Sequence, residues 1–239
     1  MIKKIVTISR LILIAVVTIF FAFATILLML IFGKHQFHHL AAVWSKLLLK
    51  ISGIKVKLIT PDGKFPLSNV VYISNHSSLF DIPVLLSSLK DNARIMYKEE
   101  LEKIPIFGWC LKMSPFLSVK REDPENAMQS FRHAVQSISD GDSVIIFPEG
   151  TRSEDGALGQ FKKGAFLLAT KSGKAIVTLA IKGTSDVMPK GKFEINPQNV
   201  TLTYIKQFDI EHIRQAGINT LMNETFDLMK QNLNPETTK

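Results

Sequence analysis

Two short segments contain the residue types that acid–base chemistry and anion binding require. The first, residues 75–81, reads NHSSLFD and places Asp81 five residues after His76. The second, residues 147–153, reads FPEGTRS and places a carboxylate and a guanidinium in one turn. A histidine beside an acid can remove a proton from a hydroxyl, and an arginine can bind a phosphate. The two segments together indicate a catalyst that activates a hydroxyl on a phosphate-bearing molecule.

The spacing of His76 and Asp81 restricts how the two side chains can meet. Residues five apart within one helix lie about 140° apart around its axis, so a continuous helix would separate them. They can meet if His76 lies in the loop after the strand 70–74 and Asp81 lies in the first helical turn, where Pro83 is tolerated. The carboxylate would then fix the tautomer of the ring and leave the other nitrogen free as a base. Taken alone, a histidine near an aspartate is more often structural than catalytic.

The second segment follows a predicted strand at residues 143–147. Pro148 cannot donate to a sheet ladder and Gly150 permits a tight turn, so the turn should present Glu149, Thr151 and Arg152 at the edge of the sheet. Arg152 offers a planar group suited to phosphate, and Glu149 would accept a hydrogen bond from a substrate hydroxyl or hold Arg152 in place. A solvated basic turn is the alternative interpretation.

The rest of the body alternates between strand and helix signals. This alternation predicts an α/β fold with a central, mostly parallel or mixed sheet flanked by helices. The clearest helix is Pro124–Ser139, with Asp123 as the N-cap and Gly141 as the stop. Further helices are expected at 163–171 and 218–233. The predicted strands are 54–59, 70–74, 94–97, 116–119, 143–147, 176–181 and 200–205.

Composition and charge point to a lipid surface. The chain has 239 residues, 46% of them hydrophobic, and a formal charge of +8. Residues 1–61 carry eight Lys or Arg and no acid, which leaves 21 basic and 21 acidic residues in the remainder. A cationic excess beside apolar sequence favours an anionic membrane surface and argues against nucleic acid as a partner. The single cysteine excludes an intrachain disulfide, and the six histidines show no metal-ligand spacing, so no metal is expected.

Residues 11–32 contain no charged side chain, which is enough to cross a membrane as a helix. A cleaved signal peptide is the competing interpretation, but the apolar run is longer than usual for one. Basic residues flank the run on both sides, and a second apolar series at 40–51 has helical spacing with Lys46 and Lys50 opposite. We therefore expect membrane-anchoring helices at 1–52, as a hairpin or in-plane anchor rather than a full crossing, and a catalytic domain at 53–239. A second helix merely packed on the body is the alternative.

Four blocks in order give the chain a resemblance to the glycerophospholipid acyltransferases, and within them to the bacterial 1-acylglycerol-3-phosphate acyltransferases. His76 and Asp81 match the H-x4-D motif of that family, and residues 147–153 match its FPEGTRS motif. Residues 98–108 are similar to its second block, and Arg121 to the arginine that follows. The fourth block usually contains a proline where this chain has Thr178. The resemblance covers roughly residues 65–185.

The resemblance implies transfer of a fatty acyl group from a thioester of acyl carrier protein or coenzyme A to the free hydroxyl of lysophosphatidic acid, without a bound cofactor. It implies that His76 is the base, that Asp81 stabilises the imidazolium, and that Arg152 holds the acceptor phosphate. Lys98 and Arg121 are further candidates for that phosphate, and N–H groups around Gly150 for the oxyanion. It also implies an inner, cytoplasmic membrane location, with the catalytic domain on the cytoplasmic side. Glycerol 3-phosphate or another lysolipid as acceptor, a thioester or lysophospholipid hydrolase, and a lipid-binding protein remain alternatives.

Overall fold

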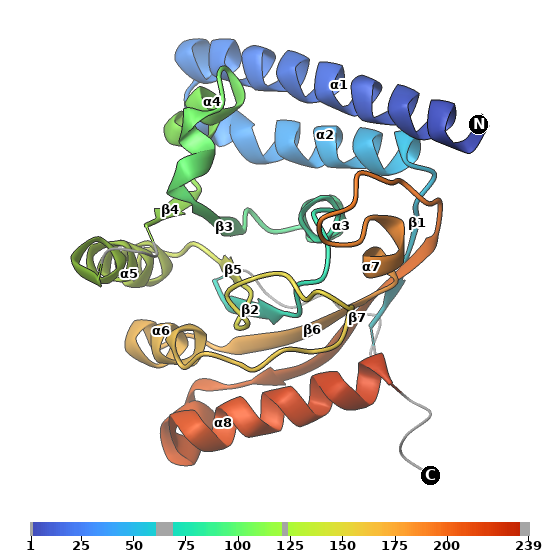
Figure 1. Ribbon diagram of the computed structural model, residues 1–239. Coiled ribbons are helices and arrows are strands. Elements are labelled where there is room, and N and C mark those ends of the chain that lie inside the picture. Colours follow the sequence, from blue (N-terminus) through green and yellow to red (C-terminus); the bar gives the residue numbers. More distant parts are fainter. Residues whose placement is uncertain (1, 61–68, 121–123, 235–239) are drawn as a thin grey trace.

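A seven-stranded sheet forms the centre of the chain (Figure 1). The computed structural model describes residues 2–60, 69–120 and 124–234. The strands lie in the order β1-β7-β6-β2-β5-β3-β4, and every neighbouring pair is parallel except the antiparallel pair of β6 and β7. The mostly parallel, mixed sheet that the sequence predicts is thus confirmed. The strands are β1 Lys55–Ile59, β2 Val71–Ser74, β3 Arg94–Lys98, β4 Leu117–Val119, β5 Val144–Ile146, β6 Ile176–Lys182 and β7 Asn199–Phe208.

Helices cover both faces of this sheet (Figure 1). The pair α1 and α2 lies above it together with α3 and α7, whereas α6 and α8 lie below. Two short 3-10 helices, η1 and η2, precede α2 and α4. The bounds are α1 Ile2–Phe32, η1 Lys34–Gln36, α2 Phe37–Ile51, α3 Asp81–Ser88, η2 Glu99–Lys103, α4 Phe107–Met113, α5 Pro124–Ser139, α6 Gly164–Ser172, α7 Thr184–Val187 and α8 Ile210–Leu233.

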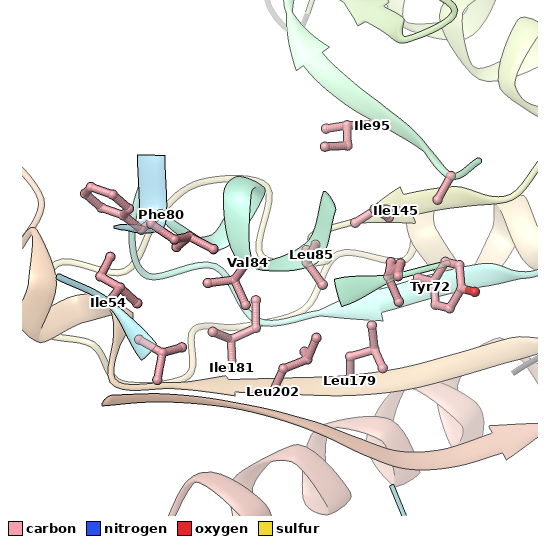
Figure 2. Packing of buried hydrophobic residues seen from close by; sticks show 14 of the residues in the cluster. Ile54, Tyr72, Phe80, Val84, Leu85, Ile95, Ile145, Leu179, Ile181 and Leu202 are labelled. Carbon is pink, nitrogen blue, oxygen red and sulfur yellow. The ribbon is translucent and has the colours of Figure 1, made fainter. Parts of the chain in front are cut away.

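Each face of the sheet has its own apolar core. Above the sheet, α3 directs Val84 and Leu85 toward Leu179 and Ile181 of β6 (Figure 2). Below the sheet, Phe166 of α6 and Leu221 of α8 belong to a second cluster, which also contains Ile73 of β2. All of these side chains are fully or almost fully buried. The upper core has a direct consequence for function, because it fixes α3, whose first residue is Asp81.

The elements expected from the sequence are present, with shifted ends. All seven predicted strands form, and Pro124–Ser139 forms a helix with the predicted bounds. The predicted N-cap, Asp123, lies outside the described residues. The last helix begins eight residues earlier than predicted, at Ile210, and is kinked at Gly217, where φ is 74°. The single turn α7 was not predicted, because four residues are too few for a periodic pattern.

The two N-terminal helices are docked on the body. Helix α1 includes a 29-residue stretch, Lys4–Phe32, that is long and apolar enough to cross a membrane. It packs on α2 and α4, and Trp44 of α2 donates a hydrogen bond of 3.1 Å from Nε1 to the Thr18 hydroxyl. Helix α2 in turn buries Leu48 and Leu49 and packs on α3. The second helix therefore packs on the body, whereas a membrane-anchoring role of residues 1–52 stays a prediction.

Candidate active site

The sheet topology gathers the predicted site residues at one edge. Strands β2, β5, β3 and β4 are consecutive neighbours and parallel, so their carboxyl ends lie side by side. His76 follows β2, Glu149 follows β5, and Lys98 ends β3. This is the position at which open α/β sheets bind ligands. Two segments about seventy residues apart in sequence thus become neighbours.

His76 and Asp81 are in direct contact. The Nδ1 atom of His76 lies 2.8 Å from Oδ2 of Asp81, with His76 in the loop after β2 and Asp81 at the start of α3. A carboxylate only accepts hydrogen bonds, so Nδ1 carries the proton of the neutral ring and Nε2 is left with its lone pair. The Asp81 side chain is fully buried, whereas 18% of the His76 side chain is exposed. The ring is therefore both oriented and accessible, as the sequence predicts.

The Asp81 carboxylate is held by three further donors. The main-chain N–H groups of Ser77 and Ser78 donate to Oδ2 at 2.8 and 2.9 Å. The hydroxyl of Thr184, at the start of α7, donates to Oδ1 at 2.5 Å and also contacts the Ser77 hydroxyl at 3.0 Å. The two serines hold the loop and do not cap α3, whose N-cap residue is Phe80. Sequence reasoning missed Thr184, since it lies 103 residues from Asp81.

Glu149 joins the second segment to the loop that carries His76. Its Oε1 accepts from the main-chain N–H of His76 at 2.7 Å, and its Oε2 accepts from the N–H of Gly159 at 2.8 Å. Burial raises the pKa of Glu149, against the opposing effect of these two hydrogen bonds. Glu149 therefore holds the main chain of His76, a positioning role that the sequence did not indicate. No ion pair of Glu149 with Arg152 is seen among the described residues, and a contact of Glu149 with a substrate hydroxyl stays a prediction.

Further contacts fix the histidine from other sides. The ring of Phe147 stacks on the His76 ring, with 4.1 Å between centroids and 17° between planes. The N–H of Ser153 donates to the carbonyl of His76 at 2.9 Å. The Asn75 side chain bonds both main-chain groups of Ile181 in β6, at 2.8 and 2.9 Å, and so continues the sheet beyond β2. Asn75 and Phe147 lie within the two segments, but their roles could not be predicted. A side chain that bonds to the main chain of another strand, or that stacks on a ring, has no characteristic spacing in the sequence.

The turn at Gly150 brings a lysine to the site. Gly150 has φ of 73°, and its N–H donates to the Phe147 carbonyl at 3.0 Å, so this group is already used within the turn. A Cβ atom at residue 150 would lie 3.0 Å from Nζ of Lys162. The side chain of Lys162 therefore extends across the glycine. The main-chain N–H of Lys162 donates to the Pro148 carbonyl at 2.8 Å. The glycine is needed both for its left-handed backbone and for the close approach of the lysine.

Thr151, Arg152 and Lys98 lie at or near the same edge. Thr151 is exposed and Arg152 is half-buried, and Lys190 donates from Nζ to the carbonyl of Arg152 at 3.0 Å. No hydrogen bond or ion pair of the Arg152 guanidinium with another described residue is seen. Lys98 is about half exposed and forms an ion pair with Glu100 at 3.3 Å. Arg121 lies outside the described residues.

Two cavities are lined in part by residues next to His76 and Asp81 in the chain. An apolar cavity of about 100 Å³ is enclosed by α1, α2, α3 and α4, and Ile82, which follows Asp81, forms part of its wall. Trp44 and Cys110 also line it, and burial raises the pKa of the Cys110 thiol to about 11. A second, polar cavity of about 550 Å³ begins at Ser77, which follows His76. A chain neighbour of His76 thus lines the polar cavity, and a chain neighbour of Asp81 lines the apolar one.

The position where the fourth block usually has a proline lies inside the sheet. Thr178 of β6 is fully buried, and its hydroxyl has no hydrogen-bond partner among the described residues. The pairing of β6 with β7 shifts register between Thr178 and Leu179. Such an irregularity is where a strand can accommodate a proline, since a ladder hydrogen bond is disturbed there. Thr178 thus lies where the pairing of the sheet is irregular, opposite Ile73 of β2.

The chain is similar to known acyltransferases of plants and bacteria. The family model described as Acyltransferase matches residues 57–182 of the chain. The chain is 40% identical over 162 residues to the chloroplastic 1-acyl-sn-glycerol-3-phosphate acyltransferase LPAT1 of Arabidopsis thaliana, covering 66% of this chain and 44% of the plant protein. It is 30% identical over 146 residues to a 1-acyl-sn-glycerol-3-phosphate acyltransferase of Borreliella burgdorferi, covering 61% and 58%. The chain thus spans less than half the length of the plant relative.

A solved structure has the same fold. The crystal structure of the 1-acyl-sn-glycerophosphate acyltransferase PlsC from Thermotoga maritima superposes with a TM-score of 0.85 at 22% sequence identity. The match covers 99% of this chain and 97% of that one, so it includes the N-terminal helices as well as the sheet.

Proposed function

Because the chain belongs to the acyltransferase family, we propose that it transfers a fatty acyl group from an acyl thioester to the free hydroxyl of 1-acylglycerol 3-phosphate, forming phosphatidic acid. The observation that carries this proposal is the contact between the two segments. Glu149 and Ser153 bind the main chain of His76 on both sides, while Asp81 binds its ring. A base is thereby fixed beside the turn that carries Arg152.

The chemistry follows from the free ring nitrogen. Nε2 of His76 removes the proton of the acceptor hydroxyl as its oxygen attacks the thioester carbonyl carbon. The carbon–sulfur bond then breaks, and the proton passes from the imidazolium to the departing thiolate. The buried carboxylate of Asp81 stabilises the imidazolium between these two steps. No bound cofactor is needed, since the thioester itself is the activated group. Its carrier is acyl carrier protein or coenzyme A.

The acceptor phosphate is assigned to the cations near the turn. Arg152 is the main candidate, because it offers two parallel donors and no described residue bonds to its guanidinium. Lys162, which lies across Gly150, and Lys98 at the end of β3 supply further positive charge at this edge. The apolar cavity between α1 and α4 begins beside Asp81 and is placed to receive part of an acyl chain.

We assign the protein to the inner membrane, with the sheet on the cytoplasmic side. The outer face of α1 exposes large apolar side chains, for example Phe20 at 65% and Leu30 at 69%. The basic excess of residues 1–61 suits an anionic lipid surface. Because α1 is packed along α2 and α4, an orientation in the plane of the interface fits better than an independent crossing.

Product analysis tests the reaction. The purified protein is given a labelled acyl thioester with either lysophosphatidic acid or glycerol 3-phosphate, and the lipids are separated. We expect labelled phosphatidic acid from the first acceptor and no labelled lysophosphatidic acid from the second. Free labelled fatty acid alone would instead indicate a hydrolase, and acylation of glycerol 3-phosphate would indicate the other acceptor.

Substitution of Arg152 tests the phosphate assignment. We expect Arg152→Ala to raise the KM for lysophosphatidic acid by about tenfold or more, because a charge-assisted bidentate contact is lost. The KM for the acyl donor should change less than about twofold. The KM of Arg152→Lys for lysophosphatidic acid should lie between those of Arg152→Ala and the unmodified protein. An equal rise in both KM values would show that Arg152 does not bind the acceptor phosphate.

A further inference from the structure

The polar cavity beside Ser77 has no role in the assignments above. It occupies about 550 Å³, within the range of small-molecule sites. Its walls come from the loop at 155–158, the end of β6 with α7, the start of β7 and the end of α8. Ser77 links it to the reaction centre, because the Ser77 hydroxyl contacts Thr184 and the Ser77 N–H donates to Asp81.

The walls are rich in neutral hydrogen-bonding groups and poor in positive charge. The side chains of Ser185, Gln198, Asn199 and Thr201 line the cavity, and no hydrogen bond joins any of them to another described residue. The titratable groups in the wall are the carboxylates of Asp155 and Asp186 and the ammonium of Lys182. A net negative wall disfavours a phosphate, whereas free amide and hydroxyl groups match a neutral chain that contains amides.

The position of the cavity separates it from the lipid side. The 155–158 loop, the end of β6, α7, the start of β7 and the end of α8 line it, and no residue of α1 or α2 does. A thioester donor brings its acyl chain on a water-soluble carrier, so its carrier must reach the site from water. A membrane-borne acceptor must arrive from the α1 side. The two substrates therefore need two entrances.

We propose that this cavity binds the pantetheine arm of the thioester donor, the amide-bearing chain that coenzyme A and acyl carrier protein share. The thioester end lies at His76, and the arm runs past Ser77 between the 155–158 loop and β7 toward the surface at the end of α8. This assignment rests on the proposed acyl transfer. It adds the donor's route to it and leaves the phosphate of the acceptor at Arg152.

Substitutions in β7 test the assignment, because the strand offers a matched pair. Thr201 and Thr203 lie on the same face of β7 and are both half-buried, but only Thr201 lines the cavity. Thr201→Trp places an indole in the space, and Thr203→Trp is the control. Asn199→Leu, at an exposed position, removes one amide from the wall with little risk to folding. Thermal unfolding confirms that each variant is folded.

Kinetics with acyl-coenzyme A and with acyl carrier protein thioester give the main readout. We expect Thr201→Trp to raise the KM for both donors by at least about tenfold and Asn199→Leu by about threefold to tenfold. The KM for lysophosphatidic acid should change less than twofold, and Thr203→Trp should resemble the unmodified protein. A rise for one donor only would show that its carrier, and not the shared arm, is bound here. A rise in the KM of the acceptor, or unchanged donor kinetics in both cavity variants, would overturn the assignment.

Direct binding separates this proposal from the proposed reaction. The probe is S-hexadecyl-pantetheine, a thioether that cannot transfer its chain, with hexadecanol as the control for the chain alone. We expect the unmodified protein to bind the thioether more tightly than hexadecanol, and Thr201→Trp to lose that difference. Binding without phosphatidic acid formation would contradict the reaction and keep the cavity assignment. Equal binding of both probes by the unmodified protein would contradict the cavity assignment, whatever the activity.

Discussion

At the residue scale, His76 is fixed through its ring and through both main-chain groups. Asp81 binds Nδ1, Phe147 covers one ring face, Glu149 binds the N–H and Ser153 binds the carbonyl. A base held in this way needs little reorganisation when a substrate hydroxyl arrives, which favours reaction. Substitution of the residues that hold His76 and Asp81 in place should then lower turnover, although these residues do not touch the substrate.

Thr184 is the clearest such positioning residue. Thr184→Val removes the hydroxyl that donates to Asp81 and contacts Ser77, and leaves a buried carboxylate oxygen without that donor. We expect kcat to fall roughly tenfold or more with little change in either KM, because the imidazole loses its fixed orientation. The free energy of unfolding should fall by about 1–3 kcal/mol.

The matched control for that change is Thr184→Ser, which keeps the hydroxyl and should restore most of kcat. Initial-rate kinetics and thermal unfolding of both variants provide the measurement. Valine and serine variants with the same kcat would show that Thr184 fills space only.

Much of the site could be predicted at this scale, and the limits are physical. His76, Asp81 and Arg152 could be selected because their spacing or side-chain chemistry is specific. The main-chain contacts of Glu149 could not be predicted, since a sequence does not show that the two oxygens of a carboxylate face the N–H groups of His76 and Gly159. Thr184 could not be selected at all, because only the parallel pairing of β2 with β6 brings it to Asp81.

At the element scale, the periodic helices and strands were predictable, whereas the irregular connections were not. Ile106, before α4, has φ of 64° and ψ of −57°, and the N–H of Phe107 donates to the Pro105 carbonyl at 2.7 Å. This is a γ-turn, which is strained for a β-branched residue. Local propensity argues against it, so tertiary contacts must impose it. Ile106 packs against the cluster that contains Met29 of α1 and Phe37 of α2.

Gly108 shows how tightly this connection is built. A Cβ atom at residue 108 would lie 2.3 Å from the main-chain oxygen of Glu102. We expect Gly108→Ala to lower the free energy of unfolding by about 1–3 kcal/mol, since the backbone of η2 or α4 must move. Chemical denaturation gives the measurement.

Gly164→Ala is the control, because residue 164 also lies at the start of a helix and no atom lies within 4 Å of its added Cβ. It should be neutral or stabilise the fold by up to about 1 kcal/mol. Equal effects of the two alanines would show that the contact between η2 and α4 is loose.

At the scale of the whole molecule, the exposed apolar face of α1 and the polar cavity are built from different elements. Helix α1 exposes apolar residues along its length and packs its other face on α2 and α4. The polar cavity is lined by the 155–158 loop, the end of β6, α7, the start of β7 and the end of α8, and no residue of α1 or α2 lines it. The apolar character of α1 was evident from the sequence, but its docking along the body was not, because hydropathy carries no information on the partner of a helix.

Charged substitutions on α1 test whether its exposed apolar face binds lipid. Leu13→Glu combined with Phe20→Glu changes two residues that are 48% and 65% exposed. We expect vesicles with anionic lipid to bind this variant at least roughly tenfold more weakly than the unmodified protein, because two apolar contacts with the bilayer are lost. Flotation with vesicles provides the measurement.

Met128→Glu is the control for that experiment, since Met128 is 53% exposed on α5, away from α1. It should bind vesicles like the unmodified protein. Equal binding by the α1 double variant would show that another surface meets the membrane.

The central claim is that the imidazole of His76 acts as the base, and single-turnover formation of phosphatidic acid by His76→Ala tests it most directly. His35→Ala, at an exposed position before α2, is the control. We expect the rate of His76→Ala to fall by about 10²- to 10⁴-fold, with normal thermal unfolding and donor binding, while the control keeps its full rate. A folded His76→Ala protein that forms phosphatidic acid within tenfold of the normal rate would contradict the account.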